Sequence, residues 1–281
     1  MAKALIPGDS QQDSPGKGVT IARIALGIEY DGSAYSGWQS QLNPHLQTVQ
    51  ECVERALSQV ADHPVKVWCA GRTDAGVHAS GQVIHFDTTA LRPLKAWILG
   101  GNSNLARTIA VRWACKVSHD FHARFSATSR RYRYLISNTS VRPAMYSNFL
   151  THHRRPLAIG SMYEAAQMLL GENDFSSFRA AGCQSRTAMR NITEVTVSRC
   201  GELVTIEIEA NAFLLHMVRN IVGTLLEIGQ GDQPPAWMGQ LLSLRDRNRA
   251  APTAPAQGLS LIQVRYPEVF AIPSSLSATP P

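Results

Sequence analysis

Hydrophobic residues in the first half of the chain recur with the spacings of strands and helices in turn. Period-two alternation predicts a strand that contains Ile24, Leu26, Ile28 and Tyr30. Apolar residues three and four positions apart predict a helix over residues 48–61, which opens with capping-box spacing. The other elements expected are a short helix over 93–99 and strands over 65–70, 82–86 and 109–117. Their order, β-α-β-β-α-β, is that of a split βαβ unit.

The second half of the chain shows a similar series of patterns. A strand over 130–137 places Tyr132, Tyr134 and Ile136 on one face. An apolar stripe over 213–228, followed by Gly229 as the expected C-cap, predicts a long helix. The remaining elements expected are a hairpin over 192–209, strands over 149–153 and 259–266, and helices over 159–170 and 237–244.

These patterns predict an α+β protein with two subdomains and mainly antiparallel sheets. We expect the subdomains to cover residues 20–120 and 121–268. Residues 1–19 are rich in Gly, Pro, Ser and Gln and lack the apolar region of a signal peptide, so we expect a disordered extension there. Residues 269–281 are rich in Pro and Ser and are expected to form a flexible tail.

The composition of the chain limits which partners the protein can bind and in which cell compartment it is expected. The 281 residues carry a net charge of +6, which favours a polyanionic partner such as nucleic acid or an anionic membrane surface. The five cysteines include no CxxC pair, so they are expected to be reduced thiols in the cytosol and not a disulfide framework or zinc ribbon. No apolar run approaches the roughly 18 residues of a membrane span. The histidines show no metal-ligand spacing, and we expect no metal.

The segment that points most directly to chemistry is a loop expected over residues 71–81, which begins Gly-Arg-Thr-Asp-Ala-Gly-Val-His. It is longer than the roughly two to five residues that join most hairpins, and loops of this length are often functional. Arg72 and Asp74 flank Thr73, so an extended backbone would point both side chains the same way. The guanidinium would then keep the carboxylate ionised. A purely structural turn held by an Asp–Arg pair has the same composition, and the residues alone leave both interpretations open.

Two further sets of cations are candidates for a functional site. Arg219 lies within an apolar stripe, and a buried arginine needs an anionic partner, for which Asp74 is the expected choice. The alternative places Arg219 on the polar side of its helix, in solvent. Arg130, Arg131 and Arg133 interleave with tyrosines, which predicts a strand with one cationic face for phosphates and one aromatic face for bases. The alternative is an edge strand with a solvated basic face.

The loop resembles the signature Gly-Arg-Thr-Asp-x-Gly-Val-His of the tRNA pseudouridine synthase A family, in which the catalytic aspartate matches Asp74. The resemblance covers about Ile21 to Tyr266 and extends to Tyr30-Asp31-Gly32 with Gly37-Trp38-Gln39, to Phe125–Tyr134 and to Phe213–Gly223. It implies that Tyr132 lies against the target base and that Arg219 pairs with the aspartate. The other expected substrate-binding residues are Arg72, Gln39, Arg130 and Arg131.

The family implies the pseudouridine synthase fold, with an active-site cleft between two ferredoxin-like (RRM-like) subdomains. It implies a cytoplasmic homodimer that isomerises uridines 38, 39 and 40 of the tRNA anticodon stem-loop, without a cofactor. Asp74 would act as a nucleophile or as a base, and both roles stay open. The target uridine must leave its stack at a cost of roughly a few kcal/mol.

Two other functions compete with this interpretation. A pure RNA-binding protein built on ferredoxin-like units needs an aromatic RNP1 motif, and the sequence has none. An N-glycoside hydrolase usually pairs two acids at its site, and no second acid lies near Asp74 within its loop.

Overall fold

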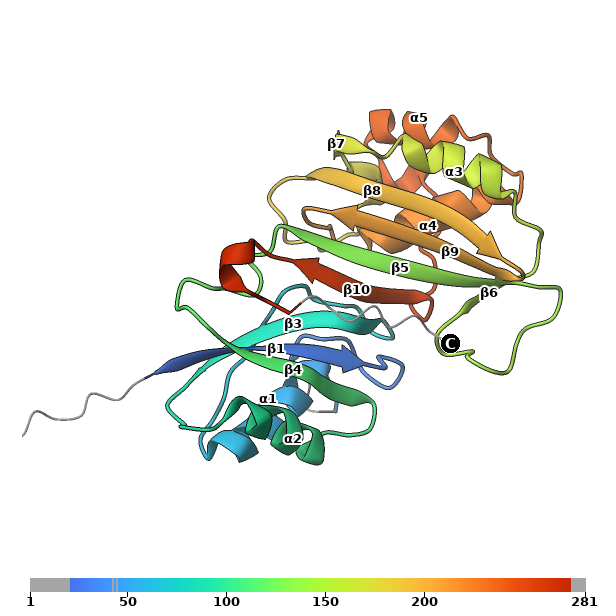
Figure 1. The fold of residues 1–281 in the computed structure, drawn as a ribbon. Coiled ribbons are helices and arrows are strands. Elements are labelled where there is room, and N and C mark those ends of the chain that lie inside the picture. Colours follow the sequence, from blue (N-terminus) through green and yellow to red (C-terminus); the bar gives the residue numbers. More distant parts are fainter. Residues whose placement is uncertain (1–20, 42, 44, 274–281) are drawn as a thin grey trace, which may run out of the picture.

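The computed structural model describes residues 21–273 except 42 and 44 (Figure 1). The expected N-terminal extension over 1–19 therefore lies outside the described residues, as does the tail from 274 onward. Ten strands form one sheet in the order β4-β1-β3-β10-β5-β9-β8-β7, with β2 paired to β3 and β6 paired to β5. Within the described residues, no helix combines the length and the apolar character that crossing a bilayer requires.

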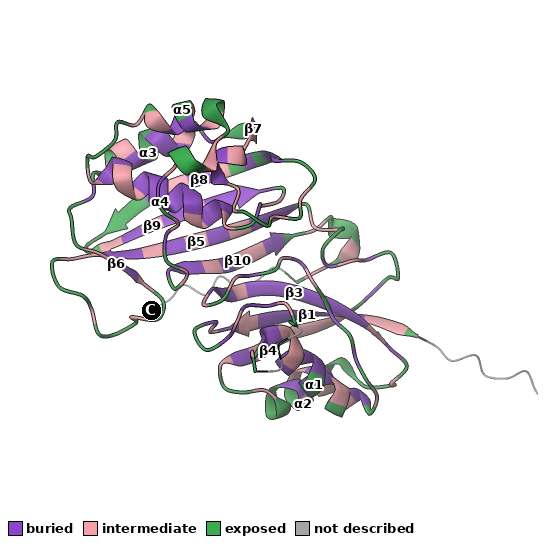
Figure 2. Cartoon of the chain, turned by 180° about the vertical axis from the view of Figure 1, so that it is seen from behind, coloured by how far each residue is buried: buried purple, intermediate pink, exposed green. Residues whose placement is uncertain are grey.

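The first half of the chain confirms the expected β-α-β-β-α-β order. Its elements are β1 (Ala22–Tyr30), α1 (Val49–Ala61), β2 (Trp68–Cys69), β3 (His78–Thr88), α2 (Leu94–Asn104) and β4 (Ile109–Val117). β1 lies between β3 and β4 and runs antiparallel to both, and most residues of β1 and β3 are buried (Figure 2). The hydroxyl of Thr48 accepts a hydrogen bond from the backbone N–H of Glu51 and caps α1 as the capping-box spacing predicts. α1 and α2 pack together on this end of the sheet (Figure 1).

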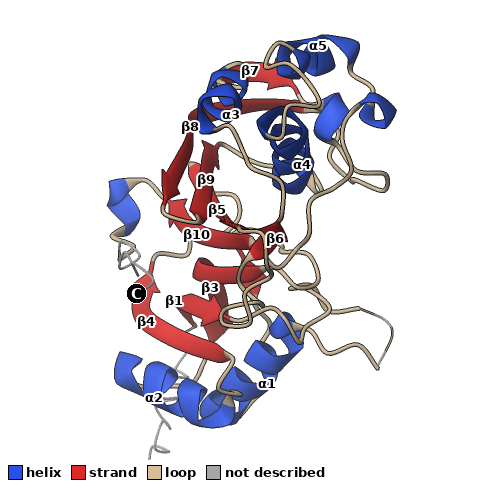
Figure 3. Cartoon of the chain, turned by 90° about the vertical axis from the view of Figure 1, so that its right-hand side faces the viewer, coloured by secondary structure: helices blue, strands red, loops and turns tan. Residues whose placement is uncertain are grey.

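The second half places its three α-helices over one face of the sheet (Figure 3). Its elements are β5 (Ser129–Asn138), β6 (Thr151–His153), α3 (Ile159–Gln167), β7 (Gly171–Asp174), β8 (Met189–Cys200), β9 (Leu203–Ala210), α4 (Met217–Gly229), α5 (Trp237–Leu244) and β10 (Leu259–Arg265). The second half also contains three short 3₁₀ helices, η1 (Ser176–Phe178), η2 (Arg247–Arg249) and η3 (Glu268–Phe270). Tyr132, Tyr134 and Ile136 all lie on the buried face of β5, as their spacing predicts.

The last strand joins the two halves into one sheet. β10 runs antiparallel to β5 and pairs in parallel with the start of β3, where Ser260 is opposite His78 (Figure 1). A Cβ atom at Gly81 would lie only 2.2 Å from the carbonyl oxygen of Ile262. The backbones of β3 and β10 therefore approach at a distance that only glycine permits.

Several expected boundaries were wrong. β3 begins at His78 and not at residue 82, so the loop before it spans Ala70–Val77 only. The long helix begins at Met217 and not at 213, because His216 has a left-handed backbone (φ 59°) that an α-helix cannot include. Gly229 is the last residue of α4, and Gln230 follows as the C-cap. Phe270, which we expected in the flexible tail, packs its ring 5.3 Å from that of Phe121.

The chain over residues 250–256 lies directly against α4. A Cβ atom at Gly223 would lie 2.0 Å from the carbonyl oxygen of Pro252, so this part of α4 has no room for a side chain. The backbone N–H of Ala254 donates to the carbonyl of Arg219 at 3.1 Å. On the other side, the hydroxyl of Tyr134 donates to the carbonyl of Pro255 at 2.8 Å. The segment is therefore held between α4 and β5.

Replacing Gly223 tests this close packing. We expect Gly223→Ala to lower the free energy of unfolding by about 1–3 kcal/mol, because the added methyl group must push the backbone at Pro252 away. Gly160, an exposed residue of α3 whose added Cβ would meet nothing within 4 Å, provides the matched control. Gly160→Ala should change stability by no more than about 1 kcal/mol, and in the favourable direction. Urea denaturation of both variants measures the difference, and equal stabilities would contradict the packing described for α4.

Candidate active site

Two buried side chains hold the start of the loop between β2 and β3. Arg130 of β5 donates from Nη2 to the carbonyl of Ala70 at 3.0 Å. Gln82 of β3 is fully buried and donates from Nε2 to the carbonyl of Gly71 at 2.6 Å. These bonds satisfy backbone groups that lack a partner in the sheet, and a buried carbonyl without a partner would cost about 1–3 kcal/mol. The beginning of the loop is therefore fixed by both halves of the chain.

The middle of the loop is held by the segment that follows β1. The backbone N–H of Trp38 donates to the carbonyl of Thr73 at 3.0 Å, and the Thr73 hydroxyl is 2.8 Å from that of Tyr30. Gly37 has a φ of 92°, and a Cβ atom there would lie 2.8 Å from the carbonyl oxygen of Thr73. Glycine thus permits both the backbone conformation and the close approach. The loop then closes with a turn over residues 74–77.

The carboxylate of Asp74 meets the N-terminal end of α4. Its Oδ2 accepts a hydrogen bond from Nη1 of Arg219 at 3.0 Å and lies 3.4 Å from Nε2 of His216. Arg219 also donates from Nε to the carbonyl of Ala254 at 2.8 Å, so its guanidinium is fixed on two sides. The Asp74 side chain is 23% exposed and that of Arg219 is 16% exposed. The contact expected between Arg219 and Asp74 is therefore present, and it holds the carboxylate in a fixed orientation.

Arg72 does not make the expected pair with Asp74. It is exposed, and it takes part in no ion pair within the part of the chain that the structure describes. The extended alternation that would align the two side chains ends at the turn that begins with Asp74. His216 is the second group beside the carboxylate instead. Sequence reasoning missed it, because His216 precedes α4 with a left-handed backbone, and the spacing of side chains along a helix does not apply to it.

Tyr132 lies beside the loop on β5. Its side chain is 8% exposed, and its ring meets that of Phe213 edge-on with centroids 5.0 Å apart. Burial raises the pKa of its hydroxyl strongly, and the charge of Asp74 raises it further, so the hydroxyl is neutral at physiological pH. A Cβ atom added to Gly71 would lie 3.5 Å from this hydroxyl. Tyr132 therefore places a neutral aromatic ring next to the loop that carries Asp74.

Arg130 and Arg131 do not form the expected cationic face. Arg130 is buried and donates to the carbonyls of residues 70, 124, 127 and 211, and this burial lowers the pKa of its guanidinium. Arg131 lies on the opposite face of β5, in ion pairs with Glu194 and Glu207 at 2.7 Å and with Glu209 at 3.5 Å. These glutamates come from β8 and β9, and cross-strand pairing neutralises the charge.

Gln39 occupies a supporting position at the start of α1. Its Nε2 donates to Oε1 of Gln50 at 2.8 Å, and the side chain is half-buried. The neighbouring Trp38 binds the loop at Thr73 through its backbone. Gln39 therefore follows the residue whose backbone binds the loop, while its own side-chain amide is hydrogen-bonded to Gln50 of α1.

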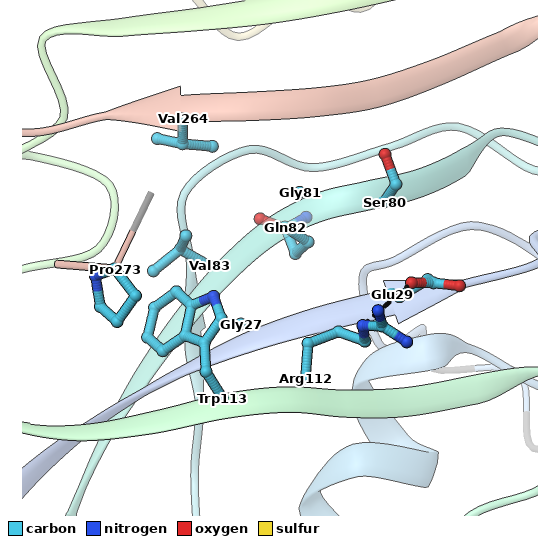
Figure 4. Close-up of a pocket in the computed structure, with 10 residues that line it drawn as sticks. All are labelled: Gly27, Glu29, Ser80, Gly81, Gln82, Val83, Arg112, Trp113, Val264 and Pro273. Carbon is cyan, nitrogen blue, oxygen red and sulfur yellow. Dashed lines mark ion pairs between the residues drawn. The ribbon is translucent and has the colours of Figure 1, made fainter. Parts of the chain in front are cut away.

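A small cavity lies on the other face of β3 (Figure 4). Its volume is about 30 Å³, comparable to the space that one water takes in the liquid. The side chains of Trp113 and Val83 line it. Val83 follows Gln82 on β3, so the two side chains point to opposite faces of the sheet, and that of Gln82 reaches the loop. The cavity is therefore separated from Asp74 by the sheet. Within the described residues, no group of three or more His, Cys, Asp or Glu side chains is arranged to hold a metal ion.

A family model and curated relatives both match this chain over most of its length. The family model described as tRNA pseudouridine synthase matches residues 27–126 and 165–267. The tRNA pseudouridine synthases A of Salmonella paratyphi B and Salmonella newport are 57% identical over 263 residues, which cover 94% of this chain and 95% of each relative. A solved Cbf5-Nop10-Gar1 complex aligns with a TM-score of 0.31 at 13% identity, over 72% of this chain and 45% of that chain. Because the family model covers more than half of the chain and the relatives match nearly all of it, this chain belongs to the tRNA pseudouridine synthase family and is an isomerase.

Proposed function

We propose that this protein converts uridines 38, 39 and 40 of the tRNA anticodon stem-loop to pseudouridine, with Asp74 as the catalytic residue. The observation that carries the proposal is the contact of the Asp74 carboxylate with Arg219, at 3.0 Å in a partly buried position. A carboxylate held in this way is charged, oriented and still accessible to a substrate. The tRNA pseudouridine synthases A that match nearly the whole chain support the choice of tRNA as the substrate.

The reaction needs only groups that this chain supplies. The N1–C1′ bond of the nucleotide breaks, the uracil turns, and a C5–C1′ bond forms. The hydrogen that leaves C5 is balanced by the hydrogen gained at N1, so the product has the same composition as the substrate. In these reaction steps Asp74 acts either as a nucleophile or as a base on the sugar. Because the substrate and the product have the same composition and oxidation state, the reaction requires no electron acceptor or group donor and proceeds without a cofactor.

Neighbouring side chains divide the remaining tasks. Arg219 donates a hydrogen bond to the Asp74 carboxylate and orients it, and the His216 imidazole lies beside the same oxygen. Tyr132 stacks on the extruded uracil, and its raised pKa fits a neutral ring better than a resident phenolate base. Arg72 is exposed and free of carboxylate partners among the described residues, so it is suited to a phosphate of the substrate. Gln39 supports the loop from its position beside Trp38.

The arginines of β5 take other roles than the sequence predicted. Arg130 is a positioning residue, because its guanidinium ties the carbonyl of Ala70 to β5. Arg131 already has three glutamate partners, so we do not assign it to the RNA. Two further points rest on the resemblance to the family: two ferredoxin-like subdomains, over 20–120 and 121–268, flank the RNA, and the working unit is a homodimer. A cytoplasmic location is supported by the five cysteines, all free thiols.

Replacing the catalytic carboxylate separates chemistry from binding. We expect Asp74→Asn to reduce pseudouridine formation by about 1000-fold or more, because an amide is neither a nucleophile nor a base at neutral pH. The affinity for tRNA should stay within about threefold, since the phosphate contacts are elsewhere. Release of tritium from C5-labelled uridine in tRNA measures the reaction, and filter binding measures affinity. An equal loss of folding or binding would show that Asp74 is structural.

Two arginines near the loop provide a matched test of the geometry. Arg219 contacts Asp74, whereas Arg72 is two residues from it in sequence and makes no such pair. Arg219→Gln should lower kcat at least about tenfold, because a charge-assisted hydrogen bond of about 1.5–3 kcal/mol is lost from the carboxylate. Arg72→Gln should mainly raise KM for tRNA, because a phosphate contact is lost. The reverse pattern would contradict the assignment of these two residues.

A further inference from the structure

Four aromatic rings form a continuous row from β2 to the segment before β5. Trp68 stacks on His85 with centroids 5.2 Å apart and ring planes 22° apart. His85 contacts His122 at 4.6 Å, and His122 contacts Phe125 at 4.3 Å. We call these four side chains the ring platform. Its two ends are open to solvent, since Trp68 is 46% exposed and Phe125 is 77% exposed. Exposed aromatic rings that cluster in this way commonly mark a binding surface.

The ring platform rests on a buried aromatic core. His85 is 1% exposed, and Phe121 below it is fully buried, with its ring near those of His85, Tyr266 and Phe270. Burial and the neighbouring His122 lower the pKa of His85 to about 4, so its ring is neutral at physiological pH. Its Nδ1 accepts a hydrogen bond from the backbone N–H of Ala123 at 3.1 Å. The exposed rings are therefore held in place before any ligand arrives, which lowers the entropic cost of binding.

Two cations beside the platform lack carboxylate partners. The Arg124 guanidinium lies 5.6 Å from the centre of the Phe125 ring, and Arg72 is exposed nearby on the loop that follows Trp68. Neither arginine takes part in an ion pair among the described residues, in contrast to Arg131 of β5. Burial raises the pKa of the Cys69 thiol, and the charges of Arg72, Arg124 and Arg130 oppose this effect in part. Flat rings beside unpaired guanidinium groups suit a ligand with bases and phosphates.

Hydrogen bonds connect the ring platform to the loop of the candidate active site. Trp68 is six residues before Asp74, so the two α-carbons are separated by at most about 20 Å. Arg130 donates to the carbonyls of both Ala70 and Arg124, and it thereby clamps the segment that carries Phe125 against the start of the loop. The segment that carries Phe125 is therefore joined to the start of the loop that carries Asp74.

We propose that the ring platform binds an unpaired nucleotide of the substrate RNA, outside the target position. Its base stacks on the exposed ring of Trp68 or Phe125, and its phosphate contacts Arg72 and Arg124. The inference rests on the proposed function, because the ligand is the RNA that this site isomerises. The two arginines favour an occupant that carries phosphates, and the exposed rings favour an unpaired base.

Ring-removal variants test the proposal by binding and by rate. We expect Trp68→Ala or Phe125→Ala, whichever removes the ring that carries the base, to weaken tRNA affinity about tenfold, and the double variant to show the same loss, because one stacked base is lost. The single-turnover rate at saturating tRNA should stay within about threefold of that of the unmodified protein, since Asp74 is untouched. Trp68→Phe should keep most of the affinity. Tyr163→Ala, which removes a 48% exposed ring from α3, is the matched control and should leave affinity unchanged. Circular dichroism and thermal unfolding confirm that each variant is folded.

Photo-crosslinking identifies the contact directly. tRNA that carries 5-iodouridine at unpaired, non-target positions of the anticodon loop is irradiated with the full-length protein, and the linked peptide is identified by mass spectrometry. The proposal predicts a link to Trp68 or Phe125 that the double alanine variant loses. Unchanged affinity of an active double variant, or links only to other residues, overturns it. A change in sedimentation of the double variant without loss of affinity assigns the rings to a protein interface instead. If the unmodified protein neither binds nor isomerises tRNA, the proposed function itself fails.

Discussion

The structure depends on one ion pair that crosses between the two halves of the chain. Asp74 comes from the loop between β2 and β3, and Arg219 comes from the first turn of α4, 145 residues later. Each charge is partly removed from water, and each would be costly without the other. The pair is therefore both a link between the halves and the contact that places a cation beside the carboxylate and fixes its position. A catalytic carboxylate needs the same two conditions, a fixed position and a defined charge.

The residues around the ion pair fix the positions of Asp74 and Arg219. Arg130 and Gln82 bind the carbonyls at the start of the loop, and the backbone of Trp38 binds its middle. On the other side, the segment over 250–256 fits against α4 at Gly223 and accepts the Nε hydrogen of Arg219 through Ala254. The two partners of the ion pair are thus supported separately. Small errors of position are costly in catalysis, and such support from rigid elements limits them.

The parts of this arrangement that follow from local pattern were predictable from the sequence. The helix over 48–61 has its own cap, and Arg219 within an apolar stripe signalled the need for an anion. Other features depend on partners that local pattern does not reveal. The charge of Arg131 is neutralised by Glu207 on β9, a residue 76 positions later. The left-handed backbone of His216 shortens α4 and brings the imidazole to Asp74, and neither effect has a sequence signature at a non-glycine residue.

The central claim is that the ionised carboxylate at position 74 carries out the isomerisation of uridine in tRNA. The most direct measurement maps pseudouridine at positions 38, 39 and 40 in tRNA from cells that lack this protein and are supplied with either the unmodified chain or the Asp74→Asn chain. The account predicts that the unmodified chain restores pseudouridine at these positions and that the folded, equally abundant Asp74→Asn chain restores none. Restoration by the Asp74→Asn chain, or unchanged modification in cells without the protein, would contradict it.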